Sequence, residues 1–135
     1  MQAIGTALSG IQASIARLNA SANNIANANS NGPLATAGTP STASSPQVYQ
    51  PVRISSASLE SGGTYTRVVP HTPGFRPVSD PTSPYANAAG MVAAPEVDFV
   101  SEMVEQIAAK LAFSANLSVV RTADEMQGRL VDRWA

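Results

Sequence analysis

The feature that most constrains the fold is the spacing of apolar residues in the first 27 positions of the chain. Apolar side chains recur at alternating intervals of four and three residues, at Ile4, Leu8, Ile11, Ile15, Leu18, Ala22 and Ile25. This spacing keeps one apolar seam on a single face of a helix and is typical of coiled coils. It predicts a helix from about Ala3 to Asn27. The helix should end before Asn31-Gly32-Pro33, because glycine tolerates a positive φ and proline cannot continue a helix.

A second apolar seam begins after Pro95. Asp98 is placed to cap a helix, and beyond it the chain has no proline and only one glycine, Gly128. The seam keeps the same spacing at first and then shifts near Ser114; its members are Val100, Val104, Ile107, Leu111, Leu117, Val120, Ala123, Leu130 and Trp134. These residues predict one long helix to about Arg133. The shift resembles a stutter, which changes the winding of a coiled coil.

The segment between the two helices differs in composition. It opens with a tract rich in Ser, Thr, Pro and Ala, which predicts a flexible loop because such a tract buries too little apolar surface to order itself. Beyond the tract, the stretches QVYQPVRIS, TYTRVV and FRPVS are separated by Gly62-Gly63 and Pro70, which predicts short strands. The expected fold is mainly α, with long N- and C-terminal coiled-coil helices (1–32 and 96–135) and a small irregular β-containing middle segment (33–95).

Composition limits how much core the chain can build alone. Although 44% of the residues are hydrophobic, only 5% are aromatic and 13% are charged. Leu, Ile, Val and Phe make up roughly a fifth of the chain, near the composition at which chains stay disordered unless a partner or a long helix pairing buries them. We therefore expect burial against partners.

Charge and cysteine usage exclude several classes of protein. The net charge is −1 and the eight Lys and Arg residues are scattered, whereas a nucleic-acid binder needs a clustered basic patch. The absence of Cys excludes disulfides and thiol chemistry. The start, MQAIGTALSG, lacks a basic region followed by a continuous apolar run, so we expect no cleaved secretory signal. No apolar run reaches the length of a transmembrane helix.

The predicted helices differ in length, about 37 Å for the first and about 54 Å for the last at 1.5 Å per residue. If they pair, about three turns of the last helix stay uncovered and need another neighbour. Outside its apolar seam, the first helix carries Ser, Ala, Gln and Asn where surface helices usually carry Lys and Glu. Such a face suits close packing because no charge must be desolvated. The alternative is a polar helix that is fully solvated.

Asparagines gather towards the end of the first helix. Asn19, Asn23 and Asn27 are spaced to lie on one strip beside the seam, where each amide can donate and accept a hydrogen bond. The strip can therefore set the register of neighbouring helices without carrying charge. The alternative is that asparagine accumulates because the helix frays towards a turn. The positions of the asparagines alone do not decide between these two interpretations.

Catalytic and metal-binding patterns are weak. His71 is the only histidine and has no carboxylate nearby in the sequence, so a triad or a metal site would need distant partners. Residues 61–64, Ser-Gly-Gly-Thr, lack the lysine and spacing of a phosphate-binding loop and predict a turn. The acidic residues Glu102, Glu105, Asp124 and Glu125 are expected at solvated or rim positions. No enzyme activity, cofactor or metal site is expected.

Two long motifs lie near the ends of the chain, SGIQASIARLNASANNIANANS at 9–30 and EVDFVSEMVEQIAAKLAFSANLSVVRTADEM at 96–126. The first resembles the N-terminal signature of the flagellar rod and hook axial proteins, and the second is similar to that family's C-terminal helix. FRPVSDPTSPYANAAGMVAAPEVDFVSEM at 75–103 resembles the short proximal-rod subtype C, whose length also agrees.

This resemblance implies a structural subunit of the periplasmic rod of the bacterial flagellum. Such a subunit is exported unfolded through the flagellar type III apparatus without a cleaved signal peptide. Its terminal helices then join the axial tube that transmits torque and surrounds the export channel. The implied partners are other rod proteins, further copies of the chain and the export apparatus, with no nucleic acid and no small-molecule substrate.

The expected assembly interface comprises the two seams and the asparagines: Ile4, Leu8, Ile11, Ile15, Leu18, Asn19, Asn23, Asn24, Ile25, Asn27, Val100, Val104, Ile107, Leu111, Leu117 and Val120. The alternative function is a soluble helical adaptor or export chaperone, in which the two seams close on each other.

Overall fold

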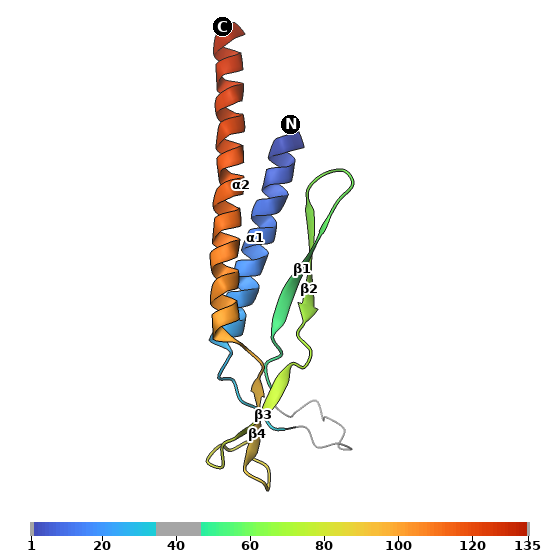
Figure 1. Cartoon of the computed structure of the whole chain (residues 1–135), viewed down its shortest axis with the longest axis vertical. Helices are drawn as coiled ribbons and strands as arrows, with labels where there is room; N and C mark the ends of the chain where they lie inside the picture. The colour runs from blue at the N-terminus through green and yellow to red at the C-terminus, as the bar shows by residue number, and fades with distance from the viewer. Residues whose placement is uncertain (1, 35–46, 135) are drawn as a thin grey trace.

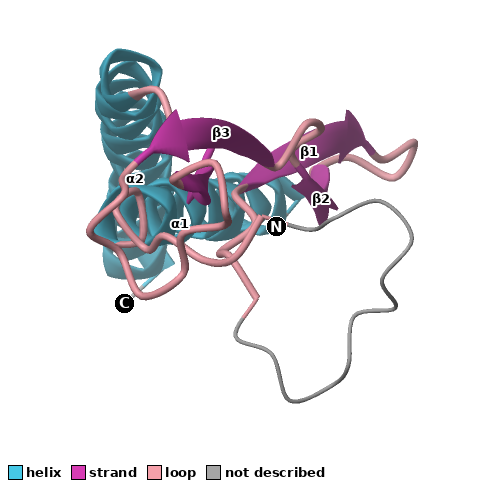
Figure 2. Cartoon of the chain, turned by 90° about the horizontal axis from the view of Figure 1, so that it is seen from below, coloured by secondary structure: helices cyan, strands magenta, loops and turns pink. Residues whose placement is uncertain are grey.

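The computed structural model describes residues 2–34 and 47–134. In chain order the elements are α1 (Gln2–Ala26), β1 (Val52–Ser58), β2 (Thr64–Pro70), β3 (Phe75–Ser79), β4 (Met91–Pro95) and α2 (Phe99–Trp134). The helices are antiparallel, and α1 lies between α2 and the β1–β2 hairpin (Figures 1 and 2). The β3–β4 unit lies beyond the end of the helix pair (Figure 1). Most of the tract predicted to be a flexible loop, residues 35–46, falls outside the described residues.

The predicted fold class is wrong. Helix is still the largest part of the described chain, but the terminal helices do not form the expected coiled coil and the middle segment is not irregular. It combines two helices with four strands in two regular two-stranded antiparallel sheets. The positions of both helices are nevertheless confirmed to within one residue at each end. The coiled-coil prediction fails because no seam residue of α1 is buried and the first four seam residues of α2 are exposed.

The buried face of α1 is made of small and polar residues. Its buried residues are Ala7, Ala13, Ser14, Ala20, Ser21 and Asn24. At 100° per residue these positions centre about a third of a turn around the helix from the predicted seam. None of the seam residues Ile4, Leu8, Ile11, Ile15, Leu18, Ala22 and Ile25 is buried. The face expected to point outward is therefore the one that packs, because only small side chains let α1 approach two neighbours at once.

Gly10 shows how closely the two helices approach each other. A Cβ atom at this position would lie 2.7 Å from Nδ2 of Asn116, so α2 occupies the space that a side chain would need. On the facing side of α2, Ala109 is 0% exposed. A coiled coil instead needs large apolar knobs at its contact.

The β1–β2 hairpin is closed by the turn that residues 61–64 predict. Gly62 and Gly63 adopt φ values of 86° and 101°, which favour glycine. The strands pair from Val52 opposite Pro70 to Ser58 opposite Thr64. A side chain at Gly63 would also meet Ser9, since its Cβ would lie 2.8 Å from the Ser9 Oγ. The turn therefore lies against α1.

The β3–β4 unit ties the end of α1 to the start of α2. β3 pairs with β4 from Phe75 opposite Pro95 to Ser79 opposite Met91. Gly32, which follows α1, exchanges two backbone hydrogen bonds of 2.9 Å with Ala93 of β4. α2 then begins after Asp98, whose carboxylate accepts from the backbone N–H of Val100 at 3.1 Å. In the described part of the chain, neither helix is long and apolar enough to cross a membrane.

Candidate assembly surface

An ion pair joins the middle of α1 to α2. Arg17 donates to both carboxylate oxygens of Glu105, with 2.9 Å between Nη2 and Oε2. This hydrogen bonding raises the pKa of the Arg17 guanidinium. Arg17 is the only charged residue in the first 52 positions. Its ion pair with Glu105 links the two helices. Glu105, expected at a solvated or rim position, is partly exposed at the edge of the helix contact and is paired there with Arg17.

Asn24 is the junction of three elements. It is 3% exposed. Its Nδ2 donates to the carbonyl oxygen of Val52 at 2.8 Å and to Oε1 of Glu102 at 2.7 Å. Its Oδ1 accepts from the Val52 N–H and from the Tyr49 hydroxyl, both at 3.0 Å. Every donor and acceptor of the amide is thereby used, which ties α1 to α2 and β1.

Two serines on α1 extend this polar contact. The Ser21 hydroxyl donates to the carbonyl oxygen of Glu102 at 3.0 Å, and the Thr64 N–H donates to the Ser9 hydroxyl at 3.0 Å. Near the same junction, burial and then the charge of Glu102 raise the pKa of the Tyr49 hydroxyl. Glu102 thus also lies at an interhelix contact rather than at a solvated position.

The outward face of α2 carries a row of exposed apolar side chains. The α2 stripe, defined as Val100, Met103, Val104, Ile107 and Leu111, lies about half a turn from the face that packs on α1. All five side chains are exposed, Ile107 to 68% and Leu111 to 71%. Most of the surface of this stripe is therefore left uncovered by the described residues.

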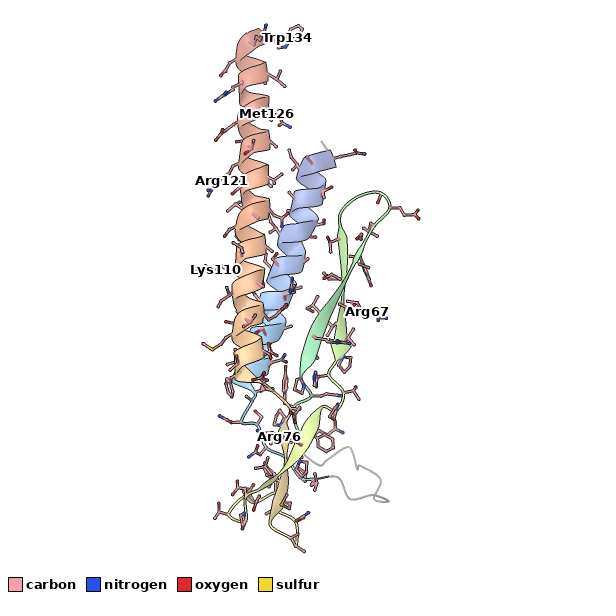
Figure 3. All side chains as sticks on the ribbon, in the orientation of Figure 1. Arg67, Arg76, Lys110, Arg121, Met126 and Trp134 are labelled. Carbon is pink, nitrogen blue, oxygen red and sulfur yellow. The ribbon has the colours of Figure 1, made fainter. Side chains whose placement is uncertain are left out.

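The outward face of α1 is similar. The α1 stripe, defined as Ile4, Leu8, Ile11, Ile15 and Leu18, contains two exposed side chains, Leu8 and Ile15, and three half-buried ones. α2 also extends past the start of α1, where the side chains of Met126 and Trp134 project from the uncovered helix (Figures 1 and 3). Trp134 is 88% exposed. The helix pair thus packs through small and polar residues and leaves much of its large apolar side-chain surface exposed.

The predicted interface residues differ in exposure. Leu8, Ile15, Val100, Val104, Ile107 and Leu111 are exposed, whereas Ile4, Ile11 and Leu18 are half-buried, as are Leu117 and Val120 on the α1-facing side of α2. Asn19 and Asn23 are exposed and Ile25 is half-buried, while Asn27 donates to the Asn23 carbonyl oxygen at 2.9 Å. Asn24 lies inside the subunit. Sequence reasoning missed Ser9, Arg17 and Ser21 as packing residues; the isolated charge of Arg17 was the available signal.

The remaining polar groups form local contacts. Asp98 accepts from the Ser101 hydroxyl and then from backbone N–H groups, and these bonds lower the pKa of its carboxyl. His71 is exposed, with its Nδ1 2.8 Å from the carbonyl oxygen of Pro73. Within residues 2–34 and 47–134, no three His, Cys, Asp or Glu side chains are grouped to hold a metal ion.

Fold and surface together are typical of a subunit that completes its apolar contacts inside a larger assembly. Comparison with known proteins indicates which assembly this is. Residues 88–133 match the family model described as "Flagellar basal body rod FlgEFG protein C-terminal". This match covers α2 and the strand before it.

Relatives in several bacteria extend the match. The flagellar basal-body rod proteins FlgC of Escherichia coli O6:H1 and Salmonella typhimurium are each 34% identical over 119 residues, covering 87% of this chain and 85% of theirs. The FlgC protein of Aquifex aeolicus is 34% identical over 68 residues, and the alignment spans about half of each chain. The chain belongs to the flagellar basal-body rod protein FlgC family.

Proposed function

We propose that the chain is a structural subunit of the flagellar basal-body rod that is incorporated through the α1 and α2 stripes. The observation that carries the proposal is the exposure of the α2 stripe, and of Leu8 and Ile15 in the α1 stripe, on a chain that belongs to a rod-protein family. A subunit that functioned alone would leave this apolar surface in water.

The size of the stripes indicates how many neighbours are needed. Full burial of one Leu, Ile, Val or Met side chain contributes about 1.5–3 kcal/mol, so the five side chains of the α2 stripe contribute on the order of 10 kcal/mol. Association costs about 4–15 kcal/mol in lost translational and rotational freedom. One stripe therefore roughly offsets the cost of one association, and stable incorporation requires contacts on several sides.

Contacts on several sides are what an open helical assembly provides. Such an assembly uses heterologous interfaces, in which different faces of the subunit meet different neighbours. The neighbours we propose are further copies of this chain and other rod proteins, in the periplasmic part of the basal body. In this position the subunit transmits torque and surrounds the export channel. We further propose export through the flagellar apparatus without a cleaved signal peptide and no enzymatic role.

The alternative, a soluble adaptor or export chaperone, is not favoured. In that function the two apolar seams would close on each other. The α1–α2 contact instead uses Arg17, Ser21 and Asn24 with their partners on α2.

Deletion of the gene and examination of basal bodies tests the function. We expect the deletion to abolish flagella, and we expect mass spectrometry of basal bodies from the parent strain to detect the chain in the rod fraction. Re-expression of the intact chain should restore swimming. Flagellated deletion cells, or rods that lack the chain, would contradict the proposal.

A further inference from the structure

A cleft of about 320 Å³ opens where α1, β1 and the start of α2 meet. Its apolar lining comes from Ala20, Val52 and Ile54, and its charged lining includes Arg17, Glu102 and Glu105. The cleft therefore offers an apolar floor beside carboxylates, which suits a partner with apolar and basic side chains next to each other.

The two carboxylates of the cleft differ in their partners. Glu105 is paired with Arg17. Glu102 accepts a hydrogen bond from the neutral amide of Asn24, and no ion pair to it is formed by the described residues. Arg53, an exposed residue of β1, lies at the rim. A half-buried carboxylate without a cation is stabilised when a partner supplies one.

The stretch of α2 beyond α1 presents such an arrangement. Met126, Arg129, Leu130 and Arg133 follow the spacing i, i+3, i+4 and i+7, so they share one edge of the helix. All four are exposed. This basic and apolar edge has the anchor pattern of helices that bind in grooves.

We propose that residues 126–134 of one copy dock this edge into the cleft of the next copy, with Arg129 facing Glu102 and Arg133 beside it. The proposal rests on the proposed function. The occupant is a second copy because the edge and the cleft of one chain are about 40 Å apart along the same straight helix, too far to meet. The contact joins two different surfaces of the subunit, so it repeats along an assembly instead of closing a dimer.

Cysteine cross-linking tests the contact directly, because the native chain contains no Cys. The full chain carrying Ser101→Cys, which changes one atom in the cleft lining, is mixed with the full chain carrying Met126→Cys under mild oxidation. We expect a disulfide between the two variants, which requires Cα atoms within about 7 Å. The control is Glu125→Cys, one residue along and about 100° around the helix. Equal cross-linking of the two partners, or none with Met126→Cys, would overturn the proposal.

Charge variants give an independent measurement. Glu102→Gln keeps an oxygen that accepts from Asn24 but removes the charge. We expect Glu102→Gln, and separately the double variant Arg129→Gln/Arg133→Gln, to raise the concentration needed for self-association by about tenfold in sedimentation. Combining the changes should add little, since both remove the same pair. The control Arg121→Gln lies outside the edge and should leave association unchanged.

These experiments distinguish a failure of the proposed contact from a failure of the proposed function. Unchanged association of Glu102→Gln, full additivity of the charge variants, or a chain that stays monomeric at high concentration each overturns the docking between copies. Rod yield and swimming in the re-expression experiment report on the proposed function independently. A swimming strain with no cross-link therefore rejects only this contact.

Discussion

The inward and outward faces of the helix pair have opposite compositions. Between α1 and α2 lie small side chains, an ion pair and a fully hydrogen-bonded asparagine, whereas Ile, Leu, Val and Met dominate the outward stripes. In most amphipathic helices the apolar side faces the protein's own core. This inversion indicates that small residues, hydrogen bonds and an ion pair hold the two helices together. The exposed apolar residues are then available for contacts with neighbouring subunits.

The largest effect on the inward face is expected for Asn24→Ala. The change leaves the Val52 backbone groups and the Glu102 carboxylate without a buried partner, so we expect a loss of about 3 kcal/mol or more in the free energy of unfolding. Urea unfolding of the full chain, followed by circular dichroism, measures it. Asn23→Ala, at the exposed neighbouring position, is the control and should change stability by less than about 1 kcal/mol.

A smaller loss is expected where the helices approach most closely. Gly10→Leu places a side chain against Asn116, and such overpacking typically costs about 1–3 kcal/mol. A Cβ atom at Gly5 would meet no neighbouring element within 4 Å, so Gly5→Leu should be neutral or stabilising by up to about 1 kcal/mol. Thermal melting of the two variants decides the matter; equal melting temperatures would argue against close packing at Gly10.

The asparagine strip, Asn19, Asn23 and Asn27, provides a further test on the exposed side of α1. Asn19 and Asn23 are exposed, so Asn→Ala at both should raise helix propensity by up to roughly 1 kcal/mol in total. If their amides set the register of neighbouring helices, the same double variant should lower rod yield, and Asn→Asp at both should lower it further. Full rods in both backgrounds would show that the strip is only a fraying helix end.

The smallest effect is expected at the cap of α2. The pKa of Asp98 is lowered from its usual 3.8, so its contribution to stability is present above that value and is lost as pH falls through the folded-state pKa. Asp98→Ala should therefore be less stable than the native chain near neutral pH, and the difference should shrink below about pH 4. Melting temperatures across this pH range measure it. A constant difference would mean that the ionised carboxylate is not what caps the helix.

The sequence predicts the positions of the helices but not the faces on which they pack. Apolar spacing, Asp98 and the Asn-Gly-Pro stop define the bounds because they act within a few residues. Packing depends on contacts between distant residues, such as Arg17 with Glu105 and Gly32 with Ala93. An apolar seam shows which face will be covered, but not whether its own chain or a neighbour covers it.

The candidate site, like the fold, could be predicted only in part from the sequence. The spacing picks out the residues of the two stripes except Met103, and their role in assembly stays a prediction. The inward contact was missed because serine, alanine and asparagine are also common on solvated helices. Arg17 was the exception, since a single charge on an otherwise neutral face requires a partner or water.

The most direct test compares a carboxylate on each face of the same helix, two residues apart. Ala109 is 0% exposed against α1 and Ile107 is 68% exposed on the α2 stripe. We predict that Ala109→Asp destabilises the isolated chain by several kcal/mol, because its carboxylate is buried without a partner. Ile107→Asp should unfold like the native chain yet give no rods and no swimming. An unstable Ile107→Asp chain, or rods assembled from it, would contradict the division between a polar inside that folds the subunit and an apolar outside that assembles it.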